Sequence, residues 1–277
     1  MNTLDHYAVF GHPIGHSKSP RIHTLFAQQT QQQLAYEAQD VPAELFDTAI
    51  GAFLKRGGKG LNCTVPLKEL AWQRADTLTE RAQFSKAVNT LAVQKDGTLL
   101  GDNTDGLGLV ADLTNNHSIV LENSRILILG AGGASRGIVA PLMEKSPYCI
   151  VIANRTVEKA NTLGAEFGHL GKISGCGYDA IKNKQFDLII NATSASLTGN
   201  LPPLGENILA KKGNCYDLAY GNLPTAFVKW GIDHAAEQSL DGLGMLVEQA
   251  AEAFYIWRGV RPETSRIIEV LNTERQY

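Results

Sequence analysis

The chain has 277 residues and a hydrophobic content of 44%, enough to bury a sizeable core, and we expect two modest domains. Its formal net charge of −3 argues against a broad basic surface and therefore against nucleic acid as a partner. No apolar run approaches the ~20 residues that span a bilayer, and the N-terminus has no signal-peptide pattern, so we expect a cytoplasmic protein without a membrane partner.

Cysteine usage agrees with that compartment. The four cysteines form no CxxC pair and no His/Cys ligand spacing. This pattern favours reduced thiols that act as small buried hydrophobes, and it predicts no metal site.

The first hundred residues alternate short strand-like runs with helix-like runs, which predicts an α/β domain. Expected strands cover 6–11, 34–41, 60–66 and 89–97, and expected helices cover 21–33 and 43–56.

A second alternation starts at residue 125 and has continuous apolar strands, as expected when helices cover both faces of a parallel sheet. Its strands are expected near 125–129, 148–155, 186–194 and 213–220, with helices over 137–145 and 157–168. We place the domain boundary near Thr104 to Leu109. The last long segment, 242–262, has apolar residues at three- and four-residue spacing, which predicts an amphipathic helix that ends before Pro262.

A glycine-rich turn follows the strand 125–129. Gly130, Gly132 and Gly133 lie where backbone amides and the positive end of a helix can meet a pyrophosphate. The third position of the G-x-G-x-x-G pattern is Ser135, so the motif is indicative mainly because a strand precedes it and a helix follows it. An ordinary strand-to-helix turn is the alternative. We therefore predict a dinucleotide site.

Basic and polar residues end the next strand. An NAD-binding fold places an acidic residue about 20 residues after the glycines, whereas an NADP-binding fold uses a basic one for the 2′-phosphate. Here Arg155 can contact phosphate in a bidentate manner, Asn154 and Thr156 add neutral donors, and Lys159 adds a charge. This pattern favours NADP, although a solvated arginine at the start of a helix is the plain alternative.

Polar residues of the first domain suggest a second site. An extended chain would place Asn62 and Thr64 on one face, and Ser17 and Ser19 likewise, because side chains two residues apart point the same way. Taken singly, Lys68, Asn89 and Asp105 have ordinary explanations as a surface lysine, a hairpin cap and a helix cap.

Taken together, eight motifs in chain order closely resemble the shikimate dehydrogenase family, which includes shikimate and quinate dehydrogenases. They are GHPIGHSKSP, NCTVPLK, AVNT, GDNTDG, GAGGASRG, NRT, NATSA and DGLGMLVEQAA, and they run nearly end to end. The resemblance implies NADP-dependent, reversible reduction of 3-dehydroshikimate to shikimate, a step toward chorismate and the aromatic amino acids. It also implies a substrate-binding and catalytic domain over 1–105 plus about 241–277, with a C-terminal helix that returns to it, and a Rossmann-like NADP domain over 106–240.

The family's motifs suggest roles for particular residues. Ser17 and Ser19 would bind the substrate carboxylate, and Lys68 would act as general acid/base with Asp105 as its electrostatic partner. Around the ring hydroxyls the resemblance places Asn62, Thr64, Asn89, Tyr220 and Gln249. On the cofactor side it places Gly130, Ala131, Gly132, Gly133, Ala134, Asn154, Arg155, Thr156, Lys159, Asn191, Thr193, Leu218, Gly242 and Glu80. His12 and His16 receive no role.

Three alternatives stay open at this point. A quinate/shikimate dehydrogenase with broader cofactor use would carry an acidic residue near Asn154 and Arg155, which this chain lacks. Methylenetetrahydrofolate dehydrogenase is a distant possibility to which the serine pair is poorly suited. A non-catalytic NADPH sensor would have lost the polar residues of the first domain. The sequence leaves open whether the protein is a monomer or a homodimer.

Overall fold

The computed structural model describes residues 4–275, apart from the Leu197 side chain. The chain divides into two compact units: Met1–Gly108 with Val247–Glu269, and Leu109–Leu246 with Val270–Tyr277. By this division residues 106–108 group with the first unit, and residues 241–246 and 270–275 group with the second, whereas the sequence predicts the reverse for each segment. Among the described residues, no helix is long and apolar enough to cross a membrane.

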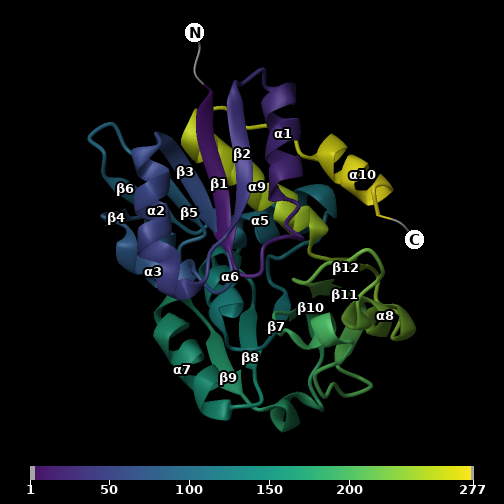
Figure 1. Cartoon of the computed structure of the whole chain (residues 1–277). Coiled ribbons are helices and arrows are strands. Elements are labelled where there is room, and N and C mark those ends of the chain that lie inside the picture. The colour runs from purple at the N-terminus through teal and green to yellow at the C-terminus, as the bar shows by residue number, and fades with distance from the viewer. Residues whose placement is uncertain (1–3, 276–277) are drawn as a thin grey trace. The chain divides into compact units, whose positions relative to one another are not determined.

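The first unit is built on a mixed sheet in the order β2-β1-β3-β5-β6-β4 (Figure 1). Strand β5 runs antiparallel to both of its neighbours, and the other pairings are parallel. The strands are β1 (Asp5–Gly11), β2 (Leu34–Asp40), β3 (Gly58–Cys63), β4 (Thr77–Leu78), β5 (Thr90–Val93) and β6 (Leu99–Asp102).

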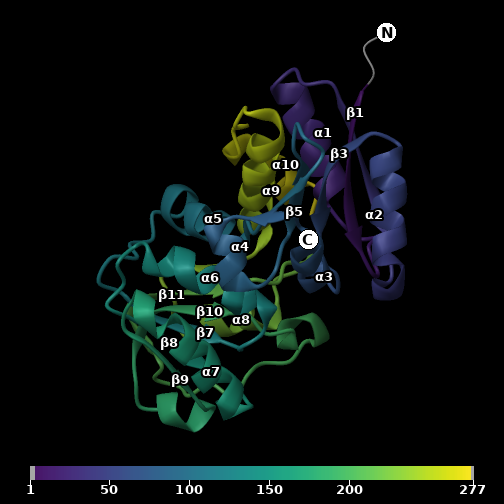
Figure 2. The same cartoon turned by 90° about the vertical axis from the view of Figure 1, so that its left-hand side faces the viewer.

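Helices cover both faces of this sheet, as Figure 2 shows with α2 on one side and α1 and α9 on the other. Side chains of α2 such as Phe46 and Phe53 pack with Phe10 and Leu61 of the sheet. On the opposite face, Phe254 of α9 packs edge-on against Phe26 of α1. The helices are α1 (Ser19–Gln29), α2 (Phe46–Lys55), α3 (Lys68–Arg74), α4 (Glu80–Ser85), α5 (Asp105–Ala111), α9 (Leu243–Arg258) and α10 (Ser265–Thr273), the last three of which cross a boundary between the units.

The second unit holds an all-parallel sheet in the order β12-β11-β10-β7-β8-β9. The chain starts in the middle at β7, runs outward to β9, then returns to β10 on the other side, which is the doubly wound order of a dinucleotide-binding fold. The strands are β7 (Arg125–Leu129), β8 (Cys149–Ala153), β9 (Ile173–Cys176), β10 (Phe186–Asn191), β11 (Leu209–Asp217) and β12 (Ser239–Asp241). The predicted α/β class and doubly wound second sheet are confirmed.

Three helices pack on this sheet. They are α6 (Gly133–Met143), α7 (Val157–Phe167) and α8 (Ala226–Asp233). Helix α7 packs against β8 and β9, and α8 packs against β11 and β12 (Figure 1). Because the strands are apolar on both faces, Leu127, Leu129 and Ile189 lie in one buried cluster with Phe227 of α8, while Ile126 and Ile128 are also fully buried.

The structure qualifies the cysteine prediction. All four cysteines are free thiols, as expected, but only Cys63 and Cys215 are buried, whereas Cys149 and Cys176 are half-buried. Both of these half-buried thiols lie at the ends of strands, where packing is less complete. Burial raises the pKa of Cys63 well above its usual value and the pKa of Cys215 to about 12.

Candidate functional site

Lys68 and Asp105 form an ion pair in the first unit, with Nζ 2.5 Å from Oδ2. Lys68 is the first residue of α3, and Asp105 is the first residue of α5. A carboxylate is favoured at that position by the unsatisfied N–H groups of the first helical turn. The side chains are 29% and 15% exposed, so the pair is shielded yet still open to a small ligand.

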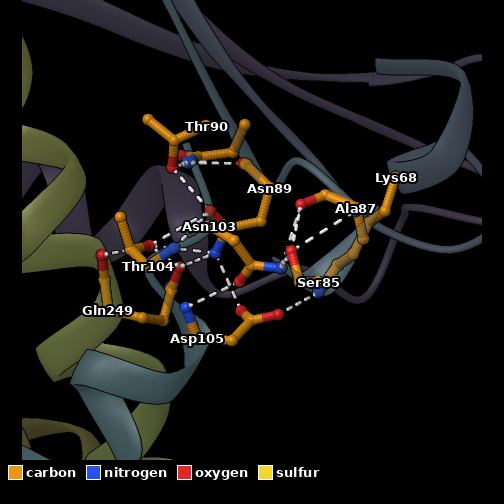
Figure 3. A network of polar contacts seen from close by, with 10 residues as sticks. Lys68, Ser85, Ala87, Asn89, Thr90, Asn103, Thr104, Asp105 and Gln249 are labelled. Atoms are coloured by element: carbon orange, nitrogen blue, oxygen red, sulfur yellow. Dashed lines mark hydrogen bonds and ion pairs between the residues drawn. The ribbon is translucent and has the colours of Figure 1, made fainter. Parts of the chain in front are cut away.

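Asn89 connects this pair to its surroundings (Figure 3). Its Nδ2 donates to Asp105 Oδ1 at 2.8 Å and lies 3.2 Å from Gln249 Oε1 on α9. The close approach of α9 requires Gly108, because a Cβ there would lie 2.7 Å from the backbone nitrogen of Gln249. Four of the predicted residues, Lys68, Asn89, Asp105 and Gln249, therefore meet at one place.

Asn62 is also buried here, but its hydrogen bonds are made within the protein. Its Nδ2 donates to the backbone oxygen of Asn89 at 3.1 Å and to Thr90 Oγ1 at 3.0 Å, and its Oδ1 accepts from Tyr36 at 2.6 Å. Both amide hydrogens are thus used. Thr64, half-buried just beyond β3, donates its backbone N–H to Phe10.

The serine segment differs from the extended geometry that the sequence predicted. Lys18, between the serines, has φ −84° and ψ −7°, and Ser19 is already the first residue of α1. The reason is a local turn in which the backbone N–H of Ser19 donates to Ser17 Oγ at 3.3 Å, followed by Pro20 in the first helical turn, where proline is well tolerated. Of the two histidines without a role, His16 is exposed and His12 pairs with Asp40 at 3.1 Å.

The glycine turn of the second unit leaves its backbone accessible. Gly130 has a φ of +103°, which favours glycine, and a Cβ at Gly132 or Gly133 would meet nothing within 4 Å. Ser135, in the third position of the motif, is fully buried and donates to the Gly130 oxygen at 2.8 Å. The serine therefore ties the turn to the start of α6, and this explains how the motif can lack its third glycine. Ala131 lies in the same turn, and Ala134 is the second residue of α6.

Arg155 follows the carboxyl end of β8, and Lys159 lies in the first turn of α7. Asn154 Nδ2 donates to the Thr156 oxygen at 2.9 Å and holds the connection to α7. Arg155, Thr156 and Lys159 are exposed. Among residues 4–275 we find no hydrogen bond or ion pair that occupies the Arg155 guanidinium, so it is open to an anion. These groups and the glycine turn fit the phosphate-rich half of a dinucleotide.

The remaining cofactor-side residues lie in several segments. Asn191, at the end of β10, donates to Ser196 and Asp217, and Thr193 donates back to Asn191 at 2.7 Å. A Cβ at Gly242 would lie 2.3 Å from the Leu218 oxygen, so glycine is needed there. Tyr220, just after β11, is half-buried, and burial raises its pKa. Glu80 is an exposed residue of α4 in the first unit.

Sequence reasoning missed several polar residues that support these sites. Thr104 is fully buried, and its Oγ1 accepts from Asn89 Nδ2 at 2.9 Å. Thr90 is also fully buried, and its hydroxyl donates to Asn89 Oδ1. In the second unit, burial raises the pKa of Asp217, which accepts from Asn191 and from Thr225. The sequence signal that could have identified Asp217 is its position as a polar residue at the end of a buried strand. No group of His, Cys, Asp and Glu among the described residues could hold a metal ion.

The doubly wound sheet with its glycine turn, and the lysine–aspartate pair in a separate α/β unit, define a dinucleotide-dependent dehydrogenase type of protein. Residues 9–91 match the family described as shikimate dehydrogenase substrate binding domain, residues 112–199 match shikimate / quinate 5-dehydrogenase, and residues 242–271 match shikimate 5′-dehydrogenase C-terminal domain. The chain belongs to the shikimate dehydrogenase family.

Similar proteins cover the whole chain. A shikimate dehydrogenase (NADP(+)) of Methylococcus capsulatus is 59% identical, over 100% of this chain and 99% of the relative. A crystal structure of an Ael1 enzyme from Pseudomonas putida is 45% identical with a TM-score of 0.91, over 96% of this chain and 98% of that chain. The shikimate 5-dehydrogenase of Thermus thermophilus, in complex with NADP(H) and shikimate, is 32% identical with a TM-score of 0.87, over 98% and 99% of the two chains.

Proposed function

We propose that this chain catalyses the NADP-dependent, reversible reduction of 3-dehydroshikimate to shikimate. The observation that carries the proposal is the Lys68–Asp105 pair, joined through Asn89 to Gln249 in a member of this family. Relatives over the full length are named NADP(+)-dependent shikimate dehydrogenases.

Reduction of the ketone needs a hydride at carbon and a proton at oxygen. When bound, NADPH supplies the hydride. Lys68 Nζ gives a proton to the carbonyl oxygen as that oxygen gains charge, and takes a proton from the hydroxyl in the reverse direction. Asp105 holds the ammonium in place, since Lys68 Nζ and Asp105 Oδ2 are 2.5 Å apart.

Other residues bind and orient the two ligands. Ser17 and Ser19 donate hydroxyl hydrogen bonds to the substrate carboxylate, and Thr64, Asn89 and Gln249 face its ring hydroxyls, with Tyr220 as a further contact. Asn62, whose amide hydrogens are used within the protein, acts mainly by supporting Asn89. On the cofactor side, the turn from Gly130 to Ala134 holds the pyrophosphate, and Arg155 with Thr156 and Lys159 holds the 2′-phosphate. Gly242, Leu218 and the Asn191–Thr193 segment line the rest of that site.

The test is a direct assay of the purified protein with shikimate and NADP, following the absorbance of the reduced nicotinamide. Fast turnover with this pair, and much slower turnover with NAD or with quinate, is the expected result. Equal rates with NAD or quinate would point to a broader quinate/shikimate dehydrogenase. NADPH binding without turnover of any pair of substrate and cofactor would instead identify the protein as a non-catalytic NADPH sensor.

A further inference from the structure

Thr90, the first residue of β5, is fully buried and has no part in the reaction described above. Its hydroxyl donates to Asn89 Oδ1 at 2.9 Å (Figure 3) and accepts from Asn62 Nδ2 at 3.0 Å. The group therefore uses both its donor and an acceptor position on two neighbouring amides. A ligand is not needed to satisfy it.

From Asn62 the hydrogen bonds continue in the direction away from the Lys68–Asp105 ion pair. Tyr36 of β2 donates to Asn62 Oδ1 at 2.6 Å, and its ring stacks on His23 with centroids 4.1 Å apart and an 8° angle between planes. With the tyrosine hydroxyl donating to the amide oxygen, the amide nitrogen of Asn62 faces Thr90 Oγ1 and the backbone oxygen of Asn89, which can only accept. Tyr36 and this backbone oxygen together set the orientation of Asn62.

Between Thr90 and the ion pair, hydrogen bonds set the orientation of Asn89 in the same way. Its Oδ1 accepts from Thr90 and from the backbone N–H of Thr104 at 2.9 Å. Its Nδ2 is then turned toward Asp105 Oδ1 at 2.8 Å. A flipped amide would bring two oxygen acceptors together at Asp105, which costs free energy because neither can donate.

We propose that Thr90 and Tyr36 are positioning residues for the reaction at Lys68. The hydrogen bonds run in one direction, from Tyr36 through Asn62, Thr90 and Asn89 to Asp105, and they hold the Asn89 amide with its N–H toward the carboxylate that faces Lys68. This inference rests on the proposed function, since it assigns Lys68 and Asp105 to proton transfer. Neither positioning residue needs to touch a ligand.

The expected effect is on turnover rather than on substrate binding. Thr90→Val keeps the shape of the side chain and removes the hydroxyl. We expect kcat with shikimate and NADP to fall about 10-fold, as for the loss of one buried hydrogen bond in a charged network, with KM for shikimate changed less than about 2-fold. Thr90→Ser restores the hydroxyl and should recover kcat to within about 2-fold. Thr77→Val, which changes an exposed residue of β4, is the matched control and should match the wild type.

Tyr36→Phe tests the same idea at the first hydrogen bond, should Thr90→Val fail to fold. We expect a smaller fall in kcat, about 3-fold, because the effect must pass through Asn62. A wild-type kcat in both variants, a Thr90→Ser variant as slow as Thr90→Val, or a change confined to KM would overturn the proposal.

A measurement without turnover separates this inference from the proposed function. In the nitrogen-15 spectrum of the free protein, the Asn89 side-chain amide protons, assigned with Asn89→Asp, should exchange slowly in the wild type and at least 10-fold faster in Thr90→Val. Unchanged exchange contradicts the inference. Absence of any wild-type turnover with shikimate would instead refute the proposed function, while the exchange rates still decide whether Thr90 orders Asn89.

Discussion

Both oxygens of the Asp105 carboxylate accept hydrogen bonds, one from Lys68 Nζ at 2.5 Å and the other from Asn89 Nδ2 at 2.8 Å. The carboxylate is therefore held from two sides, and the ammonium of Lys68 has a fixed partner. A lysine held in this way keeps its remaining donors directed toward a ligand, which is what proton transfer in either direction requires.

Lys68→Ala should lower kcat by about 10²- to 10⁴-fold, the usual contribution of a positioned general acid. Shikimate should still bind, with an affinity reduced less than about 10-fold, because the serine, threonine and amide side chains remain. Steady-state assays and calorimetric titration with shikimate measure the two effects. Lys59→Ala, an exposed lysine on β3, is the control. A Lys68→Ala variant that keeps more than a tenth of wild-type kcat would remove Lys68 from the proton-transfer step.

Arg155→Ser should weaken NADP binding far more than NAD binding. A charged hydrogen bond is worth about 1.5–3 kcal/mol, so the ratio of kcat/KM for NADP over NAD should fall about 10- to 150-fold. Lys159→Gln should have a smaller effect, since a single ammonium lacks the bidentate geometry. Lys229→Gln, exposed on α8, serves as the control. If NAD affinity fell in parallel with NADP affinity, Arg155 would act on the shared part of the cofactor.

The parts of the fold that sequence predicted are those set by local pattern. A continuous apolar strand, glycines and a following helix specify the turn at Gly130, and the strand that ends at Ala153 places Arg155 at the same edge of the sheet. The geometry of Ser17 and Ser19 could not be predicted as well, because Pro20 is compatible both with an extended residue before it and with the first turn of a helix.

Residues whose importance depends on strand pairing could not be found from one sequence. Thr90 looks like an ordinary strand residue, since threonine is common in strands. It contacts Asn62 because β3 and β5 pair antiparallel in a register that sets these two residues opposite each other. Tyr36 likewise reaches Asn62 only because β2 and β3 both flank β1. Neither spacing nor composition carries that information.

His23 should make stability depend on pH. It is fully buried, and burial lowers its pKa to about 3 against a smaller opposing effect of Asn62. In the unfolded chain the histidine has a pKa near 6.5, so between pH 3 and pH 6.5 the unfolded state binds a proton more readily than the native protein. The contribution of His23 to stability is therefore fully present above about pH 6.5 and is lost as the pH falls toward 3. At pH 5 this loss amounts to about 2 kcal/mol in the free energy of unfolding.

Urea unfolding of wild type and His23→Leu at pH 7 and pH 5 isolates this effect, because the other titrating groups are common to both proteins. The loss of stability on going from pH 7 to pH 5 should be about 2 kcal/mol smaller in His23→Leu. His16→Gln removes an exposed histidine and should behave as the wild type does. Parallel pH dependences in wild type and His23→Leu would show that His23 does not titrate in this range.

Arg275, near the end of the chain, should influence the cofactor side through Asp241. Its two guanidinium nitrogens donate to the Asp241 carboxylate at 2.7 and 2.9 Å, and the side chains are only 7% and 12% exposed. Asp241 in turn accepts from the backbone N–H of Leu243 at 3.1 Å and so fixes the start of α9 around Gly242.

Arg275→Ala leaves the Asp241 carboxylate buried without this partner, so we expect a loss of about 3 kcal/mol in the free energy of unfolding. NADP affinity should also fall, because the backbone at Gly242 is less firmly held. Arg275→Lys should lose less stability, since a lysine keeps the charge but not the bidentate geometry. Urea unfolding and calorimetric titration with NADP measure both effects, with Arg266→Ala, exposed on α10, as the control. Lower stability with unchanged NADP affinity would limit Arg275 to a structural role, and unchanged stability would contradict the importance of the ion pair itself.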